Sequence, residues 1–145
     1  PPMRAVAESL LNALGTEGPI VVYTDYERRV LDALASRYAD LAPRLASATA
    51  RLVDLHPPTK QHYAHPALNG SWSLKAVLPT VVPDLDYAQL GEVQDGLAAQ
   101  RAYFEASAAD TPAPRRETLR RGLLDYCKQD TLALVRLVEF FGRAA

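Results

Sequence analysis

The last part of the chain has the hydrophobic spacing of a long α-helix. In "LRRGLLDYCKQDTLALVRLVEFF", residues 119–141, apolar or aromatic side chains recur every three or four positions, which places them on one face of a helix. One member of this stripe is Asp130. Because an ionised carboxylate in an apolar setting is costly without a partner, we expect a basic side chain, a hydrogen-bond network, solvent at the helix rim or a metal ion to compensate it.

The rest of the pattern predicts more helices and one or two short strands. The predicted helices are 3–15, closed by Gly15, then 27–41, a helix opened by Pro43, 71–79 and 94–108. "GPIVVY" at 18–23 is typical of a short buried strand, and "RLVDL" at 51–55 of a brief one. The Pro-rich stretch "HPPTKQHYAHPALNG", residues 56–70, is predicted to be a loop.

The segment "SWSLKAVLP" has the signals of a short helix. Ser71 or Ser73 is expected to cap its start, Trp72 to anchor it and Pro79 to end it. We expect a turn or a single helical turn at 82–90, and a linker at 110–114 before the terminal helix.

A lone apolar strand at "IVVY" cannot satisfy its backbone groups. Its partner is therefore either a strand hidden in a segment predicted to be a loop or a strand that precedes Pro1. The chain opens with "PPMRAV" and not with Met, and we expect it to be an excised piece of a longer protein. For the open strand edge we expect a homodimer or a segment that covers it.

Composition narrows the class of protein. The 145 residues suit one domain with a single core, and a net charge of -1 argues against a long nucleic-acid track or an anionic membrane surface as partner. The one cysteine, Cys127, excludes an internal disulfide, favours a reducing, cytoplasmic compartment, and is expected to be a small buried hydrophobe. No apolar run is long enough to span a membrane.

Three acids are candidate functional residues. Glu27 follows the predicted strand on the same face as Leu31, and its alternative role is a capping box, "TDYE", with Thr24 as N-cap. Asp54 ends "RLVD", where its alternative role is an ordinary turn or N-cap aspartate. Asp130 lies one helical turn after Tyr126, so a phenol and a carboxylate point together, as when a metal-binding acid lies beside a group that orients water.

Other side chains give weaker signals. His56, His62 and His65 could form a metal site with Asp54, although solvated loop histidines are common. Lys75 and Arg101 could contact phosphate, or simply lie on the solvated faces of their helices.

The order of these features resembles the DnaQ-like, or DEDD, exonucleases, the group that includes proofreading and ribonuclease D domains. The features, in chain order, are the acid in "VVYTDYERRVL", the acid in "LVDL", the segment "SWSLKAVLP", and a terminal helix with Tyr-x-x-x-Asp followed by Thr. The whole chain is more closely similar to a bacterial domain of unknown function assigned to that ribonuclease H-like superfamily, often joined to a RecB-like nuclease region. The pieces that carry most of this likeness are "GSWSLKAVLP" and "LLDYCKQDTLALV".

The resemblance implies an α/β fold, with residues 1–145 as the C-terminal part of a ribonuclease H-like domain, mostly helical with one or two strands and without its first strands. By position, Glu27 matches the second acidic motif of the family, and Tyr126 with Asp130 matches the third, in the tyrosine subgroup. Asp54 matches an acid after the next strand. The family's acids hold two Mg²⁺ or Mn²⁺ ions that activate water against a phosphodiester. Ser73 and Lys75 are the implied substrate-binding residues.

The sequence departs from the family pattern in three ways. Glu27 stands where the family has Asp, Tyr23 stands where it often has Asn, and the first motif, Asp-x-Glu on a strand, is missing. We expect this motif before Pro1. The favoured hypothesis is a 3′→5′ exonuclease that acts on single-stranded DNA or RNA and is incomplete in this chain. The alternatives are a domain that binds nucleic acid or a protein without cleaving, and a scaffold for the RecB-like region.

Overall fold

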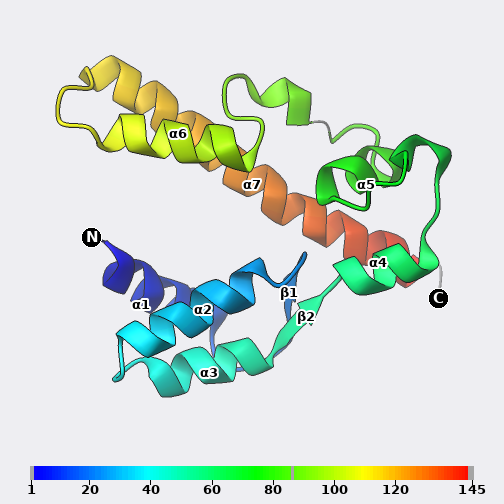
Figure 1. Ribbon diagram of the computed structural model, residues 1–145, viewed down its shortest axis with the longest axis horizontal. Coiled ribbons are helices and arrows are strands. Elements are labelled where there is room, and N and C mark those ends of the chain that lie inside the picture. The colour runs from blue at the N-terminus through cyan, green and yellow to red at the C-terminus, as the bar shows by residue number, and fades with distance from the viewer. Residues whose placement is uncertain (1, 86, 144–145) are drawn as a thin grey trace. The chain divides into compact units, whose positions relative to one another are not determined.

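The computed structural model describes residues 2–85 and 87–143. These fall into two compact units, divided between Ala64 and His65 (Figure 1). Most described residues are helical, and the strands among them form a two-stranded parallel sheet. The expected mixture of many helices with two short strands is therefore confirmed.

The first unit is built around the parallel strand pair. Its elements in chain order are α1 (Met3–Leu14), β1 (Ile20–Val22), α2 (Tyr26–Arg37), α3 (Ala42–Ala50), β2 (Leu52–Asp54) and α4 (His56–His62). In the sheet, Ile20 lies opposite Leu52 and Val22 opposite Asp54. Parallel strands need a crossover connection, which α2 and α3 provide here. β1 thus finds a partner inside the chain, and the alternative that all its partners precede Pro1 is wrong.

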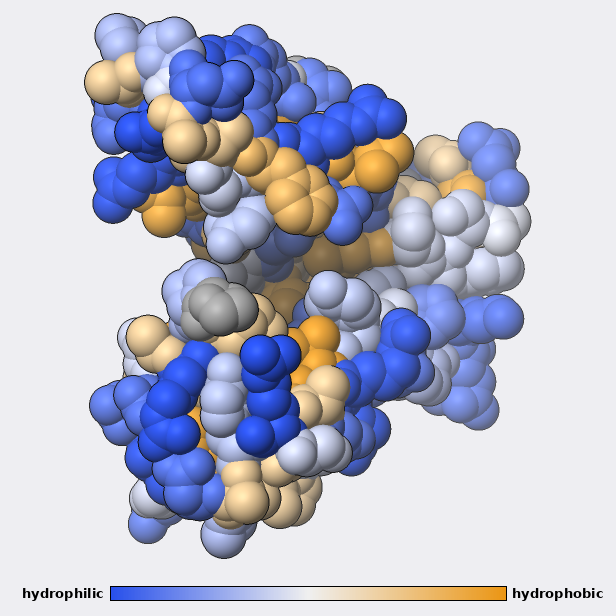
Figure 2. Space-filling view, turned by 60° about the vertical axis from the view of Figure 1, so that its left-hand side comes forward, coloured by the Kyte–Doolittle hydropathy of each residue, from blue (hydrophilic) through white to orange (hydrophobic). Residues whose placement is uncertain are grey.

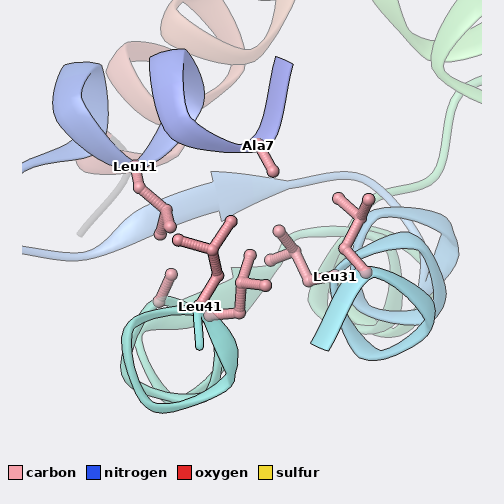
Figure 3. Close-up of a cluster of buried hydrophobic side chains, with 7 residues drawn as sticks. Ala7, Leu11, Leu31 and Leu41 are labelled. Carbon is pink, nitrogen blue, oxygen red and sulfur yellow. The ribbon is translucent and has the colours of Figure 1, made fainter. Parts of the chain in front are cut away.

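Small and branched apolar side chains fill the core of this unit. The helices, and Leu41 just before α3, contribute side chains that are at most 6% exposed: Ala7, Leu11, Leu31, Leu34, Leu41, Leu45 and Ala48. In the close-up, Ala7 and Leu11 of α1 point toward Leu31 of α2 and toward Leu41 (Figure 3). Pro43 lies in the first turn of α3, as predicted, where its missing N–H leaves no bond unmade. α2 ends at Arg37, four residues before the predicted end, because Tyr38 leaves helical geometry (φ −125°, ψ 84°).

The end of α1 is held by a glycine and an arginine. Gly15 follows the helix with φ 57°, a conformation that glycine adopts without steric cost, so its predicted role is confirmed. The guanidinium of Arg51, just before β2, donates to the carbonyls of Leu14, Gly15 and Glu17 at 2.6–3.3 Å. These bonds satisfy carbonyls left without a partner at the end of a helix.

The prediction of a loop throughout residues 56–70 is wrong for its first half. α4 occupies His56–His62, with Pro57 and Pro58 in its first turn. Prolines favour the start of a helix, where their missing N–H groups are not needed. The carbonyl of Leu55 accepts hydrogen bonds from the N–H and the hydroxyl of Thr59, which is fully buried. Local hydrogen bonding therefore outweighs the loop signal of the two prolines.

The second unit is organised along one long helix. Its elements are the 3₁₀ turn η1 (Pro66–Leu68), α5 (Leu74–Val81), the 3₁₀ turn η2 (Tyr87–Leu90), α6 (Gly96–Ser107) and α7 (Ala113–Arg143). α6 and α7 run side by side as a helical hairpin (Figure 1). Arg115 of α7 pairs with Glu105 and Glu92, and the Asp95 carboxylate caps α6 by accepting the Ala98 N–H at 2.8 Å.

The short helix α5 differs from its prediction at two points. It runs two residues past Pro79, because a proline this near the end of a helix removes one backbone bond and leaves the rest of the last turn free to form. Its anchors are Val77 and Leu78, both fully buried, whereas Trp72 is only half-buried. Ser73 is the N-cap, and its hydroxyl accepts the Ala76 N–H at 3.3 Å, which confirms one of the two predicted caps.

Apolar side chains also reach the surface of both units. Figure 2 shows orange patches among hydrophilic residues on the face it presents. Val6 of α1 is 52% exposed and Phe104 of α6 is 64% exposed. Even so, none of the helices in the described ranges has the length and apolar character needed to cross a membrane.

Candidate functional site

Asp130, the carboxylate on the apolar stripe of α7, is compensated by a phenol. The hydroxyl of Tyr87, in η2, donates to Asp130 Oδ1 at 2.6 Å. Tyr87 is 6% exposed and packs with Leu78 and Ala133. Asp130 forms no ion pair with any arginine or lysine in the ranges that the structure describes. Of the four expected kinds of compensation, the structure has hydrogen bonding.

Tyr126 and Lys75 surround this hydrogen bond. The rings of Tyr87 and Tyr126 lie 6.1 Å apart between centroids. The ammonium of Lys75, in the first turn of α5, is 5.5 Å from the Tyr87 ring and 6.0 Å from the Tyr126 ring. An ammonium at this distance over an aromatic face is electrostatically attracted to it. The second unit therefore gathers a carboxylate, two phenols and one amine.

This environment keeps both phenols protonated. Burial, with the negative charge of Asp130 and hydrogen bonding to it, raises the pKa of Tyr126 to about 12. Burial is also the main cause that raises the pKa of Tyr87, and its hydrogen bond to Asp130 adds to the shift. A raised phenol pKa means that the neutral form is favoured. At neutral pH both tyrosines therefore act as hydrogen-bond donors.

Of the two predicted substrate-binding residues, Lys75 contacts this cluster, and no contact described for Ser73 reaches it. Lys75 lies over both rings, whereas the hydroxyl of Ser73 accepts the cap bond of α5 and lies near Ser71 Oγ at 3.3 Å. Arg101 is exposed on α6, in agreement with its alternative role on a solvated helix face.

Asp54 ends β2 and ties three segments together. Its Oδ1 accepts the Thr24 N–H and the His56 N–H, both at 2.8 Å. The second bond is an Asx turn, in which an aspartate binds the backbone two residues later. The predicted turn aspartate is therefore confirmed. Asp54 also lies at the carboxyl end of a parallel strand, the edge where open α/β sheets bind ligands.

Glu27 is an exposed residue in the first turn of α2. The capping box is wrong, because the N-cap is Asp25 and Thr24 precedes it with φ 82°. The N–H of Thr24, which a capping box would offer to Glu27, is bound to Asp54 instead. Glu27 and Asp54 belong to the first unit, and Tyr126 and Asp130 to the second. The convergence of these acids on one site stays a prediction.

The three histidines do not form a ligand set. His56 packs edge-on against the buried ring of Tyr23, with centroids 5.4 Å apart, and His65 Nδ1 accepts the Ala67 N–H at 3.2 Å. His62 lies six residues after His56 on α4, a spacing that does not share a helix face. Within residues 2–85 and 87–143, no three His, Cys, Asp or Glu side chains come together as metal ligands.

Two features of this region were not found from the sequence. Tyr87 lies in a segment predicted to form a turn or a single helical turn, and 43 positions separate it from Asp130, so no local spacing links them. Cys127 is exposed and not buried as expected, because it lies beside the stripe of α7 and not on it. Desolvation, together with the charge of Asp130, raises the pKa of the Cys127 thiol, which makes it a poor nucleophile.

The family comparison covers the first unit and the start of the second. Residues 1–73 match the family model described as "Domain of unknown function (DUF2779)". The chain belongs to this family. The DUF2779 match includes Glu27 and Asp54 and ends at Ser73, whereas Lys75, Tyr126 and Asp130 lie beyond it. No curated protein and no solved structure matches the chain.

Proposed function

We propose that this DUF2779 chain is the C-terminal part of a DnaQ-like, ribonuclease H-like domain whose full-length protein is a metal-dependent 3′→5′ exonuclease. The observation that carries the proposal is the half-buried Asp130, which accepts the Tyr87 hydroxyl and forms no ion pair among the described residues. The phenol of Tyr126 lies one helical turn before it, and the amine of Lys75 is 6.0 Å from the Tyr126 ring. A carboxylate beside a neutral phenol can bind and orient water at a site of hydrolysis. The acids that open α2 and end β2 support it in the same chain order as the resembling family.

Within each unit, the described residues do not by themselves fit two metal ions. Two ions need a cage of several carboxylates, and no three potential ligands come together within the described ranges. We propose that Mg²⁺ or Mn²⁺ binds only when Asp130, Glu27 and Asp54 are joined by the acids of the missing first motif, supplied by the segment before Pro1 in the full-length protein.

The residues of this chain have definite roles in that proposal. Asp130 accepts hydrogen bonds at the reacting end of the substrate, and Tyr126, neutral below a pKa of about 12, donates a hydrogen bond that orients the attacking water. Lys75 offers its ammonium to a phosphate of a single-stranded nucleic acid. Ser73, which caps α5 beside Lys75, is the second proposed substrate contact.

Nuclease assays on the full-length protein test the proposal. The substrates are single-stranded DNA and RNA oligonucleotides with either a free or a blocked 3′ end. We expect Asp130→Asn to lower the cleavage rate at least about a hundredfold, and Tyr126→Phe to lower it without weakening substrate binding. Glu139→Gln is the matched control, since Glu139 is exposed on the same helix and pairs with Arg136. Equal cleavage by the wild type and Asp130→Asn would refute the catalytic role.

A second candidate is a domain that holds nucleic acid, or the RecB-like region, without cleaving. It is favoured by Asp54, whose Oδ1 is already bound to two backbone N–H groups, and by the exposed Glu27 in place of the family's Asp. Under this candidate, Asp130→Asn leaves nucleic-acid binding unchanged, and the full-length protein degrades no substrate with either metal. The same assay, with a binding measurement on each variant, separates the two candidates.

A further inference from the structure

Tyr87, in η2, is the most enclosed member of the cluster around Asp130. It is 6% exposed, whereas Lys75, Tyr126 and Asp130 are half-buried. Its ring packs in an apolar cluster that includes side chains of α5 and α7. A side chain so enclosed has little surface to offer a substrate, so Tyr87 can act in the proposed reaction only through its neighbours.

The hydroxyl of Tyr87 holds one oxygen of the Asp130 carboxylate. It donates to Oδ1 at 2.6 Å, and it comes from a second element, since η2 packs against α7. The carboxylate of an aspartate otherwise rotates over a broad range about χ2. A hydrogen bond from a buried ring restricts that rotation, and groups that act on a substrate need such support to keep their geometry.

The ring of the same residue contacts the ammonium of Lys75. Nζ lies 5.5 Å from the centroid of the Tyr87 ring and 6.0 Å from that of the Tyr126 ring, within reach of the attraction between a cation and an aromatic face. Lys75 forms no ion pair within residues 2–85 and 87–143, and the carboxylate of Asp95 attracts it only at longer range. The two rings are therefore the close contacts that hold the charge of this flexible side chain.

We infer that Tyr87 is a positioning residue of the proposed site, through two separate parts of its side chain. The hydroxyl orients Asp130 at the reacting end of the substrate, and the face of the ring holds the ammonium of Lys75 for a phosphate. The inference rests on the proposed function, and it adds to the site a residue 43 positions before Asp130.

Two substitutions separate the hydroxyl from the ring. Tyr87→Phe keeps the ring, so in the full-length protein we expect kcat on single-stranded oligonucleotides to fall about ten- to a hundredfold, as for a misplaced reacting group, with KM unchanged. Tyr87→Leu also removes the aromatic face, and we expect KM to rise in addition by about two- to fivefold. The Kd for a labelled single-stranded oligonucleotide with a blocked 3′ end, measured by fluorescence anisotropy, should rise by the same factor in Tyr87→Leu and stay unchanged in Tyr87→Phe.

Two control variants separate positioning from a loss of stability. Leu119→Val shortens a buried side chain of α7 that lies about two helical turns before Tyr126, and Tyr103→Phe removes an exposed phenol from α6. Both should retain the kcat, KM and Kd of the wild type. All variants are assayed at a temperature at which circular dichroism shows them to be folded.

Three results would overturn the inference. They are an unchanged kcat in Tyr87→Phe, an equal fall of kcat in Leu119→Val, and the same oligonucleotide Kd in Tyr87→Phe and Tyr87→Leu. Each of them leaves the proposed function intact as long as the wild type cleaves. A wild type that cleaves no oligonucleotide refutes the proposed function and the role of the hydroxyl with it, and the comparison of Kd values then decides the role of the ring.

Discussion

Tyr87 joins Asp130 to the packed interior of the second unit through a single hydroxyl. We expect Tyr87→Phe to keep the ring packing and lose the 2.6 Å hydrogen bond. A hydrogen bond to a charged group contributes about 1.5–3 kcal/mol, so the free energy of unfolding should fall by about that amount. Urea unfolding followed by circular dichroism measures the change.

Two comparisons make this experiment specific. Tyr103→Phe removes an exposed phenol from α6 and should leave the free energy of unfolding unchanged. Asp130→Asn keeps an oxygen that can accept the Tyr87 hydroxyl, so it should cost less than Tyr87→Phe. If Tyr87→Phe and Tyr103→Phe have the same free energy of unfolding, the hydrogen bond from Tyr87 to Asp130 does not stabilise the protein.

Alkaline pH tests the two shifted phenols together. The pKa of Tyr126 rises from an ordinary value of about 10 to about 12, and that of Tyr87 is also raised. With a raised pKa the folded protein retains the proton that the unfolded chain releases, so this contribution to stability is complete below pH 10 and is lost as pH rises toward 12. We expect the fall in unfolding free energy between about pH 10 and pH 12 to be shallower in Tyr87→Phe than in the wild type. An identical slope in the two proteins would contradict the shift at Tyr87.

At the scale of single residues, the sequence predicted that Asp130 needs a compensating partner, but it did not predict which residue that partner is. The position of Asp130 on an apolar stripe required a partner, because burial of an unpaired carboxylate is unfavourable. The choice between an arginine and Tyr87 depends on how η2 packs against α7, and no local periodicity encodes that contact. The buried Nε2 of Gln129, which makes no hydrogen bond, could not be predicted for the same reason.

Among the elements, the junction of β1, β2 and α4 depends on Asp54. Asp54→Ala removes the acceptor of both the Thr24 and His56 N–H groups, and we expect a loss of about 2–4 kcal/mol, from two bonds of the strength of a helix cap. Asp54→Asn retains Oδ1 and should cost much less. Comparing the two variants in urea, and the second in the nuclease assay, separates a structural from a catalytic aspartate.

The outcomes for Asp54 are distinct. A stable Asp54→Asn protein that has lost cleavage in the full-length context points to a role in the reaction. If Asp54→Ala is as stable as the wild type, the tie between the strand ends contributes nothing to stability.

Arg51 is expected to hold the end of α1. Arg51→Gln loses the fork that reaches the carbonyls of Leu14, Gly15 and Glu17, and should destabilise the first unit by about 1–3 kcal/mol. Arg51→Lys should restore little, because an ammonium lacks the planar fork. Amide hydrogen exchange along α1 measures the effect, with Arg28→Gln on the exposed side of α2 as control. Unchanged exchange at the end of α1 would refute the role of Arg51.

The element predictions succeeded where periodicity was long and failed where short-range hydrogen bonds competed. The stripe of α7, the glycine after α1 and the opening of α3 by Pro43 followed from spacing alone. The capping box at "TDYE" was outcompeted by Asp54, a residue 30 positions away from Thr24. α4 was missed because paired prolines at a helix start resemble those of a loop.

Among the residues that the structure describes, β1 and β2 pair only with each other, so each has one edge without a strand partner. The Ile20 N–H donates to Arg51, and the Leu55 N–H donates to Val22. In a parallel ladder of this register, the backbone groups of Val21 therefore point away from β2. A two-stranded sheet of this kind is a template for another strand, and we keep the prediction that copies of the chain associate through it.

Proline substitutions distinguish this edge from the paired side. Val21→Pro removes an outward N–H and should abolish association, while β1 stays paired with β2. Val53→Pro removes an N–H that the β1–β2 ladder uses, and should destabilise the first unit. Sedimentation velocity over a range of protein concentrations measures the association. A wild-type chain that stays monomeric throughout would contradict the prediction.

At the scale of the molecule, length and composition suggest one domain with one core, and the described residues form two compact units. That both units belong to one domain stays a prediction. Composition cannot distinguish these cases, because both bury similar fractions of apolar residues. The division depends on which stripes pack together. The stripes of α1, α2 and α3 share one cluster, whereas α5, α6 and η2 all contact α7.

The place of α7 at the end of the described chain has a consequence for synthesis on the ribosome. The apolar cluster and the strand pair of the first unit are complete once residue 54 has emerged, so that unit can fold while translation continues. Two apolar clusters described in the second unit include residues of α7, Leu119 in one and Ala133 in the other. Helices α5 and α6 must therefore wait with their apolar faces uncovered until α7 follows, and the nascent chain is most exposed to chaperones during that interval.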